Sequence, residues 1–174
     1  MTETTKDTRF TVQDYMALPE GFPAQLIEGW LVKEPAPTRW HQGIVVALTA
    51  QLLAAVDRRR VLVSPTDVVL DRWNVFQPDV LVFPEGVRVT PTMPPTVLPI
   101  LVVEVLSPGT ARRDRGVKCA GWLRAGIVEV WLVDPDAGAI EVRTRDGSTR
   151  HAGDEEAVSA AVPGFRASWR SLAE

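Results

Sequence analysis

Two carboxylates in apolar surroundings are the residues of this sequence best suited to chemistry. Glu104 lies within the run Leu98–Val105, whose other members are all apolar. A charged glutamate in such a strand is costly unless it is paired or changes its protonation state. Asp79 follows Pro78 at the start of another apolar segment, PDVLVF. If the two segments form neighbouring strands, both carboxylates reach one end of a sheet, where their oxygens suit Mg²⁺ or Mn²⁺.

A lysine in the next segment adds a third candidate. The sequence contains three lysines against sixteen arginines, so Lys118 is a specific choice of positive charge. Lysine carries a compact ammonium that can lose its proton or orient a water. Asp114, Lys118 and Trp122 recur every four residues and therefore share one face of a helix. If that face covers the sheet, Lys118 points at the carboxylates. The alternative is a surface ion pair with Asp114, worth about 0.3 to 0.5 kcal/mol.

The composition excludes several classes of protein. With one cysteine, Cys119, and two histidines, the chain cannot form an internal disulfide or a zinc finger. A net charge of −3 and a pI near 5.5 give no general attraction to nucleic acid, so such binding would depend on local arginine clusters. The sequence has no Walker loop, GxGxxG, GxSxG or HExxH motif. The first ten residues lack an apolar segment and no run is long enough to cross a bilayer, so we expect a cytoplasmic protein.

The spacing of apolar and turn residues predicts an α/β protein. Helices are expected near 11–16, over about 39–57 and over 110–124, the last ending before Gly126. Three β-branched segments, VLVSPTDVVL, PDVLVF and LPILVVEVL, are assigned to the core sheet, together with IVEVWLVD after the last helix. AQLIEGWLVKE is strand-like with a turn, and AIEVRTRDG is a hairpin. This order indicates a single domain over residues 1–174, an α/β sandwich with a central mixed β-sheet flanked by helices.

The succession of carboxylate, carboxylate and lysine is the layout of the PD-(D/E)XK nuclease superfamily. More closely, the chain resembles the Uma-type family of putative restriction endonucleases. PDV alone is a weak signal, but its combination with VVEVLSP, a helical lysine and EVWLVDP is specific. The resemblance runs from about residue 10 to residue 136, in the segments FTVQDYMALPE, QLIEGWLV, HQGIVVALTAQL, QPDVLVF and VVEVLSPGTARRDRGVKCAGWLRAGIVEVWLVDP.

This resemblance implies a restriction-endonuclease-like fold with a divalent metal site, for Mg²⁺ or Mn²⁺, at Asp79 and Glu104. The chain departs from the superfamily at one position. The superfamily's lysine usually lies two residues after the second acid, and here that position is Leu106. We therefore interpret Lys118 as a migrated lysine that reaches the site from the helix.

The resemblance adds two auxiliary residues. Glu28 is a further candidate metal ligand, since LIEGW matches an acidic position of the family, and His41 matches a polar position at the start of the long helix. Simpler roles stay open for each of them. Glu28 would be a hairpin turn residue and His41 a helix cap or a surface residue, while Asp79 would cap a turn after Pro78.

Our leading hypothesis is a metal-dependent phosphodiesterase that acts on DNA. Asp79 and Glu104 would bind Mg²⁺, and Lys118 would orient or deprotonate the attacking water. A homodimer is expected, because an enzyme that cuts both strands of a duplex gains from two symmetric sites. The main alternative is a non-catalytic nucleic-acid- or protein-binding module on a nuclease fold, since a fold does not determine a function. A nuclease that acts on something other than duplex DNA is a third possibility.

Overall fold

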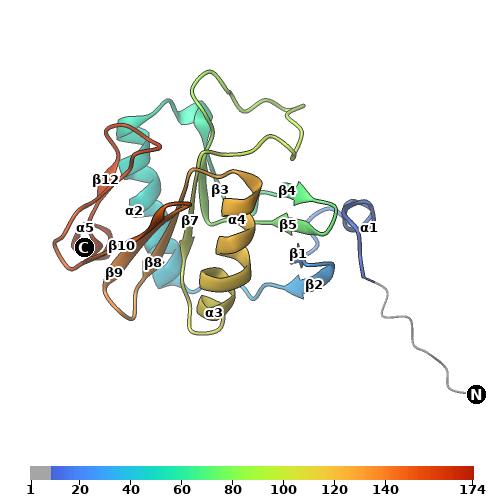
Figure 1. Cartoon of the computed structure of the whole chain (residues 1–174), viewed down its shortest axis with the longest axis horizontal. Coiled ribbons are helices and arrows are strands. Elements are labelled where there is room, and N and C mark those ends of the chain that lie inside the picture. The colour runs from blue at the N-terminus through green and yellow to red at the C-terminus, as the bar shows by residue number, and fades with distance from the viewer. Residues whose placement is uncertain (1–8) are drawn as a thin grey trace, which may run out of the picture.

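A six-stranded mixed sheet forms the centre of the computed structural model, which describes residues 9–174 (Figure 1). The expected lack of an apolar leader concerns residues 1–10, most of which lie outside this range. The strand order is β10-β9-β8-β7-β6-β3, in which β7 and β8 run parallel and all other neighbours are antiparallel. The strands are β3 (Val61–Val63), β6 (Val80–Val82), β7 (Leu101–Val105), β8 (Glu129–Asp134), β9 (Ala139–Thr144) and β10 (Gly147–Ala152).

Helix α2 (Arg39–Ala55) covers one face of this sheet. It begins after Thr38, whose hydroxyl accepts a hydrogen bond from a backbone N–H of the first turn. Ile44, Leu48 and Leu52 recur at helical spacing and are fully buried against the sheet. The helix predicted over 39–57 is therefore confirmed to within two residues.

A second helical segment covers the opposite face. It consists of α3 (Ala111–Arg113), a π-helical turn, η2 (Asp114–Lys118), and α4 (Cys119–Ala125). Gly126 ends it with φ 104°, a left-handed conformation that suits glycine. Figure 1 shows α4 in front of the sheet, with α2 on the other side. The helix predicted over 110–124 is confirmed, but its π turn was not expected.

Strand β7 is buried on both faces, as its apolar run predicts. Leu101 and Val103 pack in the cluster on the α2 side, whereas Val102 packs in the cluster that contains Trp122 of α4. Because side chains alternate along a strand, Glu104 faces the α4 side. The direction of this carboxylate is thus set by the register of the central strand.

A second sheet, in the order β2-β1-β5-β4, lies beside the first and carries α1 (Val12–Met16) (Figure 1). The assignment of VLVSPTDVVL to the core sheet is correct only for its first half, β3. Its second half, β4, pairs with β5 in the second sheet, because Pro65 has no N–H with which to continue the first strand. The strands are β1 (Ala24–Ile27), β2 (Trp30–Lys33), β4 (Val68–Asp71) and β5 (Asn74–Phe76), of which β5 was not predicted.

Short elements complete the fold. Among the helices of residues 9–174, none has the length and hydrophobicity needed to cross a membrane. The remaining elements are η1 (Arg58–Arg60), β11 (Ala157–Val158), β12 (Arg166–Ala167) and α5 (Trp169–Ala173).

Candidate active site

Asp79 and Glu104 meet at one end of the central sheet. Strands β6 and β7 are antiparallel with Val80 opposite Val103, so one residue further Asp79 stands opposite Glu104. The backbone N–H of Val105 donates a hydrogen bond of 2.7 Å to Oδ2 of Asp79 and holds that carboxylate at the sheet end. Asp79 remains partly exposed, whereas Glu104 is 3% exposed. One carboxylate therefore faces solvent and the other lies beneath it.

Lys118 reaches Glu104 from the helix. Its Nζ atom lies 2.8 Å from Oε1 of Glu104 and 3.4 Å from Oδ1 of Asp114. The lysine is only 2% exposed, so the contact with Asp114 is not the surface ion pair of the simpler interpretation. Leu106, at the superfamily's usual lysine position, is buried among the apolar residues of the α4 side.

The π turn and Trp122 fix this arrangement. Asp114 and Lys118 are the first and last residues of the π-helical turn, a feature that is frequent at functional sites. One turn later, Nε1 of Trp122 donates a hydrogen bond of 3.0 Å to Oε1 of Glu104. The indole is fully buried and packs edge-on against Phe76, with ring centroids 5.2 Å apart. The sequence analysis placed Trp122 on the same helix face as Lys118 but did not anticipate its contact with Glu104, which the four-residue spacing from Lys118 could have indicated.

Burial dominates the electrostatics of the site. Removal from water raises the pKa of Glu104 from 4.5 to about 8, while the ammonium of Lys118 opposes this shift. Burial alone would lower the pKa of Lys118, but the carboxylates of Glu104 and Asp114 outweigh it and raise that pKa. The metal-free site therefore keeps its lysine charged, and Glu104 forms a full ion pair with that lysine only when the pH is above its raised pKa.

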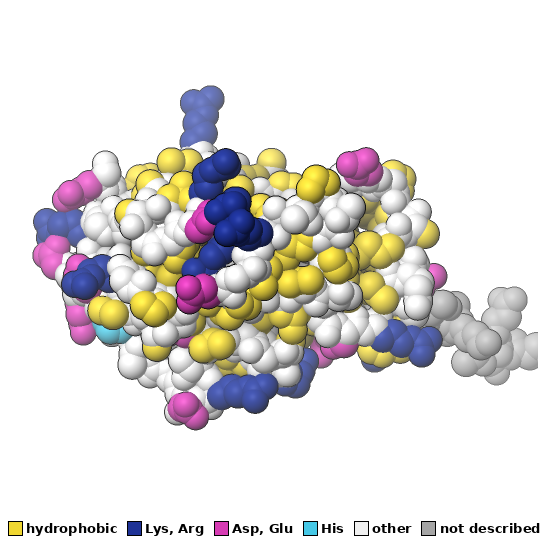
Figure 2. Space-filling view, turned by 90° about the horizontal axis from the view of Figure 1, so that it is seen from above, with side chains coloured by type: hydrophobic (Ala, Val, Ile, Leu, Met, Phe, Trp, Pro, Cys, Tyr) yellow, Lys and Arg dark blue, Asp and Glu magenta, His cyan; other side chains and the backbone are white. Residues whose placement is uncertain are grey.

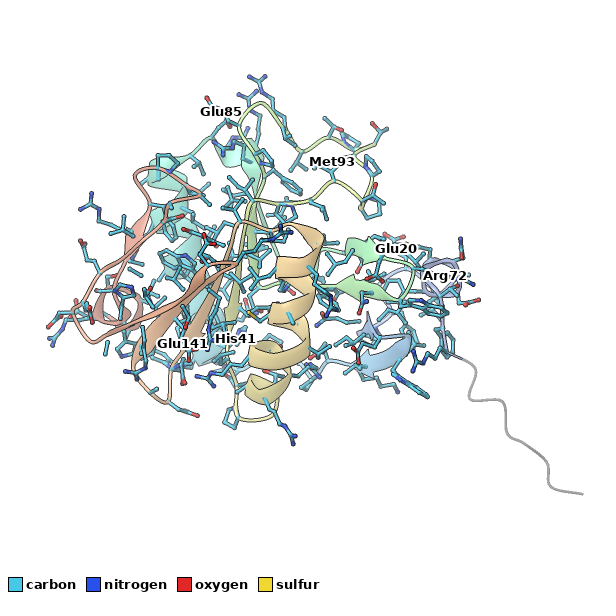
Figure 3. All side chains as sticks on the ribbon, viewed as in Figure 1. Glu20, His41, Arg72, Glu85, Met93 and Glu141 are labelled. Atoms are coloured by element: carbon cyan, nitrogen blue, oxygen red, sulfur yellow. The ribbon has the colours of Figure 1, made fainter. Side chains whose placement is uncertain are left out.

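His41 contacts the exposed carboxylate from the first turn of α2. Its Nε2 atom lies 3.3 Å from Oδ2 of Asp79 and 3.1 Å from the carbonyl oxygen of Val105. The hydrogen bond with Asp79 raises the pKa of His41, against the effect of burial. Figure 3 labels His41 near the lower end of the central sheet, beside the start of the α3–α4 segment. The side chain is not the helix cap, because Thr38 fills that position.

Glu28 lies apart from these residues. It occupies the turn between β1 and β2 with φ 51°, is exposed, and its N–H donates a hydrogen bond of 2.9 Å to Oδ1 of Asn74. It is not among the residues that line the cavity around Asp79 and Glu104. The geometry fits the alternative of a hairpin turn residue, and we leave Glu28 out of the proposed metal site.

The cavity also contains an ion pair that sequence reasoning missed. A terminal nitrogen of Arg113 donates hydrogen bonds of 2.7 and 2.8 Å to the two carboxylate oxygens of Glu34. Gln25 donates a third, of 3.1 Å, to Glu34. This cluster ties the end of β2 to the α3–α4 segment, although 79 residues separate Arg113 from Glu34, and no short-range sequence signal predicts such a contact.

The two carboxylates fit a Mg²⁺ site that has few protein ligands. Within residues 9–174, no group of three or more His, Cys, Asp or Glu side chains could hold a metal ion. Mg²⁺, however, is usually bound by one or two carboxylates, with waters and substrate phosphates as the other ligands. The hydrogen bonds described above use Oδ2 of Asp79 and Oε1 of Glu104, which leaves the second oxygen of each for a cation.

Comparisons with known proteins agree with this description. The family model "Uma2: Putative restriction endonuclease" matches residues 12–172. Among solved structures, the chain is similar to the crystal structure of a putative nuclease belonging to DUF820 from Anabaena variabilis. The TM-score is 0.80 at 21% identity, over 94% of this chain and 97% of that one. No curated protein matches. The predicted restriction-endonuclease-like fold is thereby confirmed.

Proposed function

Because the chain belongs to the Uma2 family of putative restriction endonucleases, we propose that it is a metal-dependent nuclease that hydrolyses phosphodiester bonds in DNA. Its family and fold support the reaction class. The observation that carries the proposal is local: Lys118, Asp79 and Glu104 line one cavity. Phosphodiester hydrolysis requires positive charge against the phosphate and a group that positions water, and these residues offer both.

We assign the metal site to Asp79 and Glu104. A bound Mg²⁺ or Mn²⁺ would polarise the scissile phosphate and offset the charge that develops on it. Asp79, which is partly exposed and lines the cavity, would be the more accessible of the two ligands. Trp122 and the backbone N–H of Val105 hold the two carboxylates in place. His41 contacts Oδ2 of Asp79 and would help to hold this carboxylate in place for a cation.

Lys118 acts as a cation rather than as a base in this proposal. Its carboxylate partners raise its pKa, so the side chain keeps its proton near neutral pH. An ammonium in this position can orient the attacking water and offset phosphate charge. The water-deprotonation role considered for the migrated lysine is therefore the less favoured of the two.

Local arginines support contact with DNA despite the acidic pI. Arg39 and Arg112 are exposed and adjacent in sequence to Thr38 and Arg113, which line the cavity. Such side chains can contact phosphates next to the scissile bond. Figure 2 shows the opposite end of the molecule, around residues 84–100, where Lys and Arg side chains gather near the middle of the face beside acidic and apolar ones. We place the DNA contacts at the cavity instead, because the candidate metal ligands line it.

A combined metal and cleavage measurement tests the proposal. Calorimetry with Mn²⁺ should show binding to the wild type that Asp79→Asn and Glu104→Gln each abolish. Plasmid cleavage in Mg²⁺ should be lost in the same variants. Exposed Asp146→Asn, in the β9–β10 turn, is a matched control that should change neither readout. Metal binding that survives both active-site substitutions would contradict the assignment.

A non-catalytic binding module is the second candidate, and one observation favours it. Lys118 is ion-paired with Glu104 and Leu106 replaces the usual lysine, as expected where catalysis has been lost. In that case the protein would bind nucleic acid but would not cleave it, whichever divalent metal ion is added.

We also propose a homodimer, formed through the outer face of α2. This helix has no Lys, Arg, Asp or Glu after Arg39, and Val46 and Leu53 are 65% and 44% exposed on its outer face. If α2 of a second copy packed antiparallel on this face, with the twofold axis at residue 48, Leu53 would lie over Gly43 and Val46 over Ala50. Each large side chain would then face a small one. The space around Gly43 is open, so that Leu53 of the second copy could pack there.

Charge at the helix ends is compatible with this pairing. Arg39 at one end would approach Asp57 of the second copy, which follows the other end. Light scattering at tens of micromolar should give a dimer for the wild type and for Val158→Glu, whose valine is exposed far from α2 in sequence. Leu53→Glu should give a monomer. A monomeric wild type would contradict the proposal.

A further inference from the structure

A second cavity opens directly from the candidate active site. It has a volume of about 840 Å³ and lies between α1, the following loop and the end of β2. The two cavities are continuous, because seven residues line both of them: Glu34, Pro35, Ala36, Pro37, Gln42, Ser64 and Gln77. A group bound in the second cavity would therefore lie next to a phosphate bound at Asp79.

The chemistry of this cavity does not suit a phosphate. None of its lining residues is a lysine or an arginine. Two of its acids are already occupied by protein groups: Asp67 accepts hydrogen bonds from Tyr15 and Gln77, at 2.9 and 2.8 Å, and Glu34 accepts from Arg113. Glu20, the third acid, is exposed. The lining thus supplies acidic side chains but no cation of its own, which disfavours an anion.

The same cavity suits a flat, largely apolar group with polar edges. Phe22 and Met16 present apolar surface, and Met16 is 45% exposed. Five prolines add rigid walls: Pro19, Pro23, Pro35, Pro37 and Pro65. Gln42 and Ser64 are exposed at the boundary with the active site, where they can donate to or accept from the edge of a ring. Bases bind to such surfaces by stacking, independently of sequence.

We propose that the second cavity is a base-binding pocket for an unpaired nucleotide next to the scissile phosphate. This inference rests on the proposed nuclease function and specifies its substrate class. A base inside a duplex cannot enter the cavity, because it is stacked and paired, so it must be single-stranded or rotated out of the helix. The favoured substrates are accordingly single-stranded, flapped or mismatched DNA rather than intact duplex.

Binding experiments test the pocket separately from catalysis. Fluorescence anisotropy would compare the affinity for a labelled single-stranded oligonucleotide with the affinity for its duplex. The wild type would be measured in EDTA and Lys118→Met in Mg²⁺. We expect the single strand to bind more tightly. Phe22→Ala should weaken single-strand binding about 5- to 100-fold, the loss expected for one stacking contact, and leave duplex binding nearly unchanged. Trp30→Ala removes an aromatic residue that is exposed outside the cavity and should change neither.

The outcomes separate the two proposals. Because Phe22 is only partly exposed, Met16→Ala provides a second variant if Phe22→Ala unfolds, and it should also weaken single-strand binding. Equal binding of single strand and duplex, or no effect of both variants, would overturn the base-binding pocket even if the wild type cleaves DNA. Preferential, Phe22-dependent binding would support the pocket even if the wild type cleaves nothing, a result that would instead overturn the nuclease proposal.

Discussion

The ammonium of Lys118 lies 2.8 Å from the carboxylate of Glu104, between a π-helical turn and the central strand of the sheet. Both side chains are almost completely buried. A buried ion pair of this kind contributes little net stability, because desolvation offsets the attraction between the charges. Its position beside Asp79 instead favours a functional role. In the metal-free site, the charge then depends mainly on whether Glu104 is ionised.

The stability of the metal-free protein should therefore depend on Glu104. Its pKa rises from 4.5 to about 8 in the folded state, so folded molecules hold a proton that unfolded ones release in this range. The free energy of unfolding should fall as pH increases from about 4.5 to 8. Denaturant titrations in EDTA should show a weaker decline for Glu104→Gln, and Mg²⁺ should reduce the decline in the wild type. Identical slopes for wild type and Glu104→Gln would contradict this assignment.

Gly121 should be intolerant of a side chain. A Cβ atom there would lie 2.7 Å from Cε2 of Phe76, a fully buried ring that packs edge-on against Trp122. Gly121→Ala should lower the free energy of unfolding by about 1 to 3 kcal/mol, as overpacking usually does. Gly116→Ala, in the π turn with open space around it, should stabilise by up to about 1 kcal/mol. Guanidinium-induced unfolding of both variants measures the two changes in the free energy of unfolding. Equal effects of the two substitutions would contradict this prediction.

Much of the fold follows from local sequence signals. Thr11 and Asp14 form a capping box where a helix was expected near 11–16, and Gly126 ends the α3–α4 segment, as predicted, in a left-handed conformation. The opposition of Asp79 and Glu104 could also be anticipated, because consecutive apolar segments often form neighbouring strands. In each case the determining residues are close in sequence or belong to successive elements.

What the sequence could not indicate depends on contacts between distant segments. Pro65 ends the first strand, but nothing near Val68 in the sequence shows which sheet β4 joins, since apolar strands fit either partner. The bidentate contact of Arg113 with Glu34 depends on tertiary packing alone. Glu28 also depends on such contacts: it is an acidic residue at a family-like position, but it occupies a turn and does not line the cavity.

His41 should titrate above its ordinary pKa of 6.5 because of Asp79. A histidine whose folded-state pKa is raised contributes stability that is complete below pH 6.5 and is lost as pH rises through the folded value. An NMR titration in EDTA should place the His41 midpoint above 6.5 in the wild type and lower in Asp79→Asn. The signal of His151, the other histidine, should not respond to this substitution and provides the internal control. An unchanged His41 midpoint would show that Asp79 does not hold the ring.

Lys118 should be required for cleavage but not for metal binding. Lys118→Met should reduce phosphodiester cleavage by roughly 10² to 10³, the range for loss of one group that stabilises charge in the transition state, while Mn²⁺ affinity changes little because an ammonium is not a ligand. Lys118→Arg should not restore activity, since a larger planar guanidinium does not fit between Glu104 and Asp114 at a position that is 2% exposed. Arg112→Met removes one exposed positive charge from the same helix and should have a much smaller effect.

Asp114 separates the catalytic role of Lys118 from a purely structural ion pair. If Lys118 served only as the partner of Asp114, Lys118→Arg would be tolerated and Asp114→Asn would do as much damage as Lys118→Met. In the catalytic assignment, Asp114→Asn leaves the 2.8 Å contact between Lys118 and Glu104 and should reduce cleavage much less. Cleavage of a plasmid and of a single-stranded oligonucleotide, with circular dichroism to verify folding, distinguishes the two cases. Full activity in a folded Lys118→Met protein would rule out the migrated lysine as a catalytic residue.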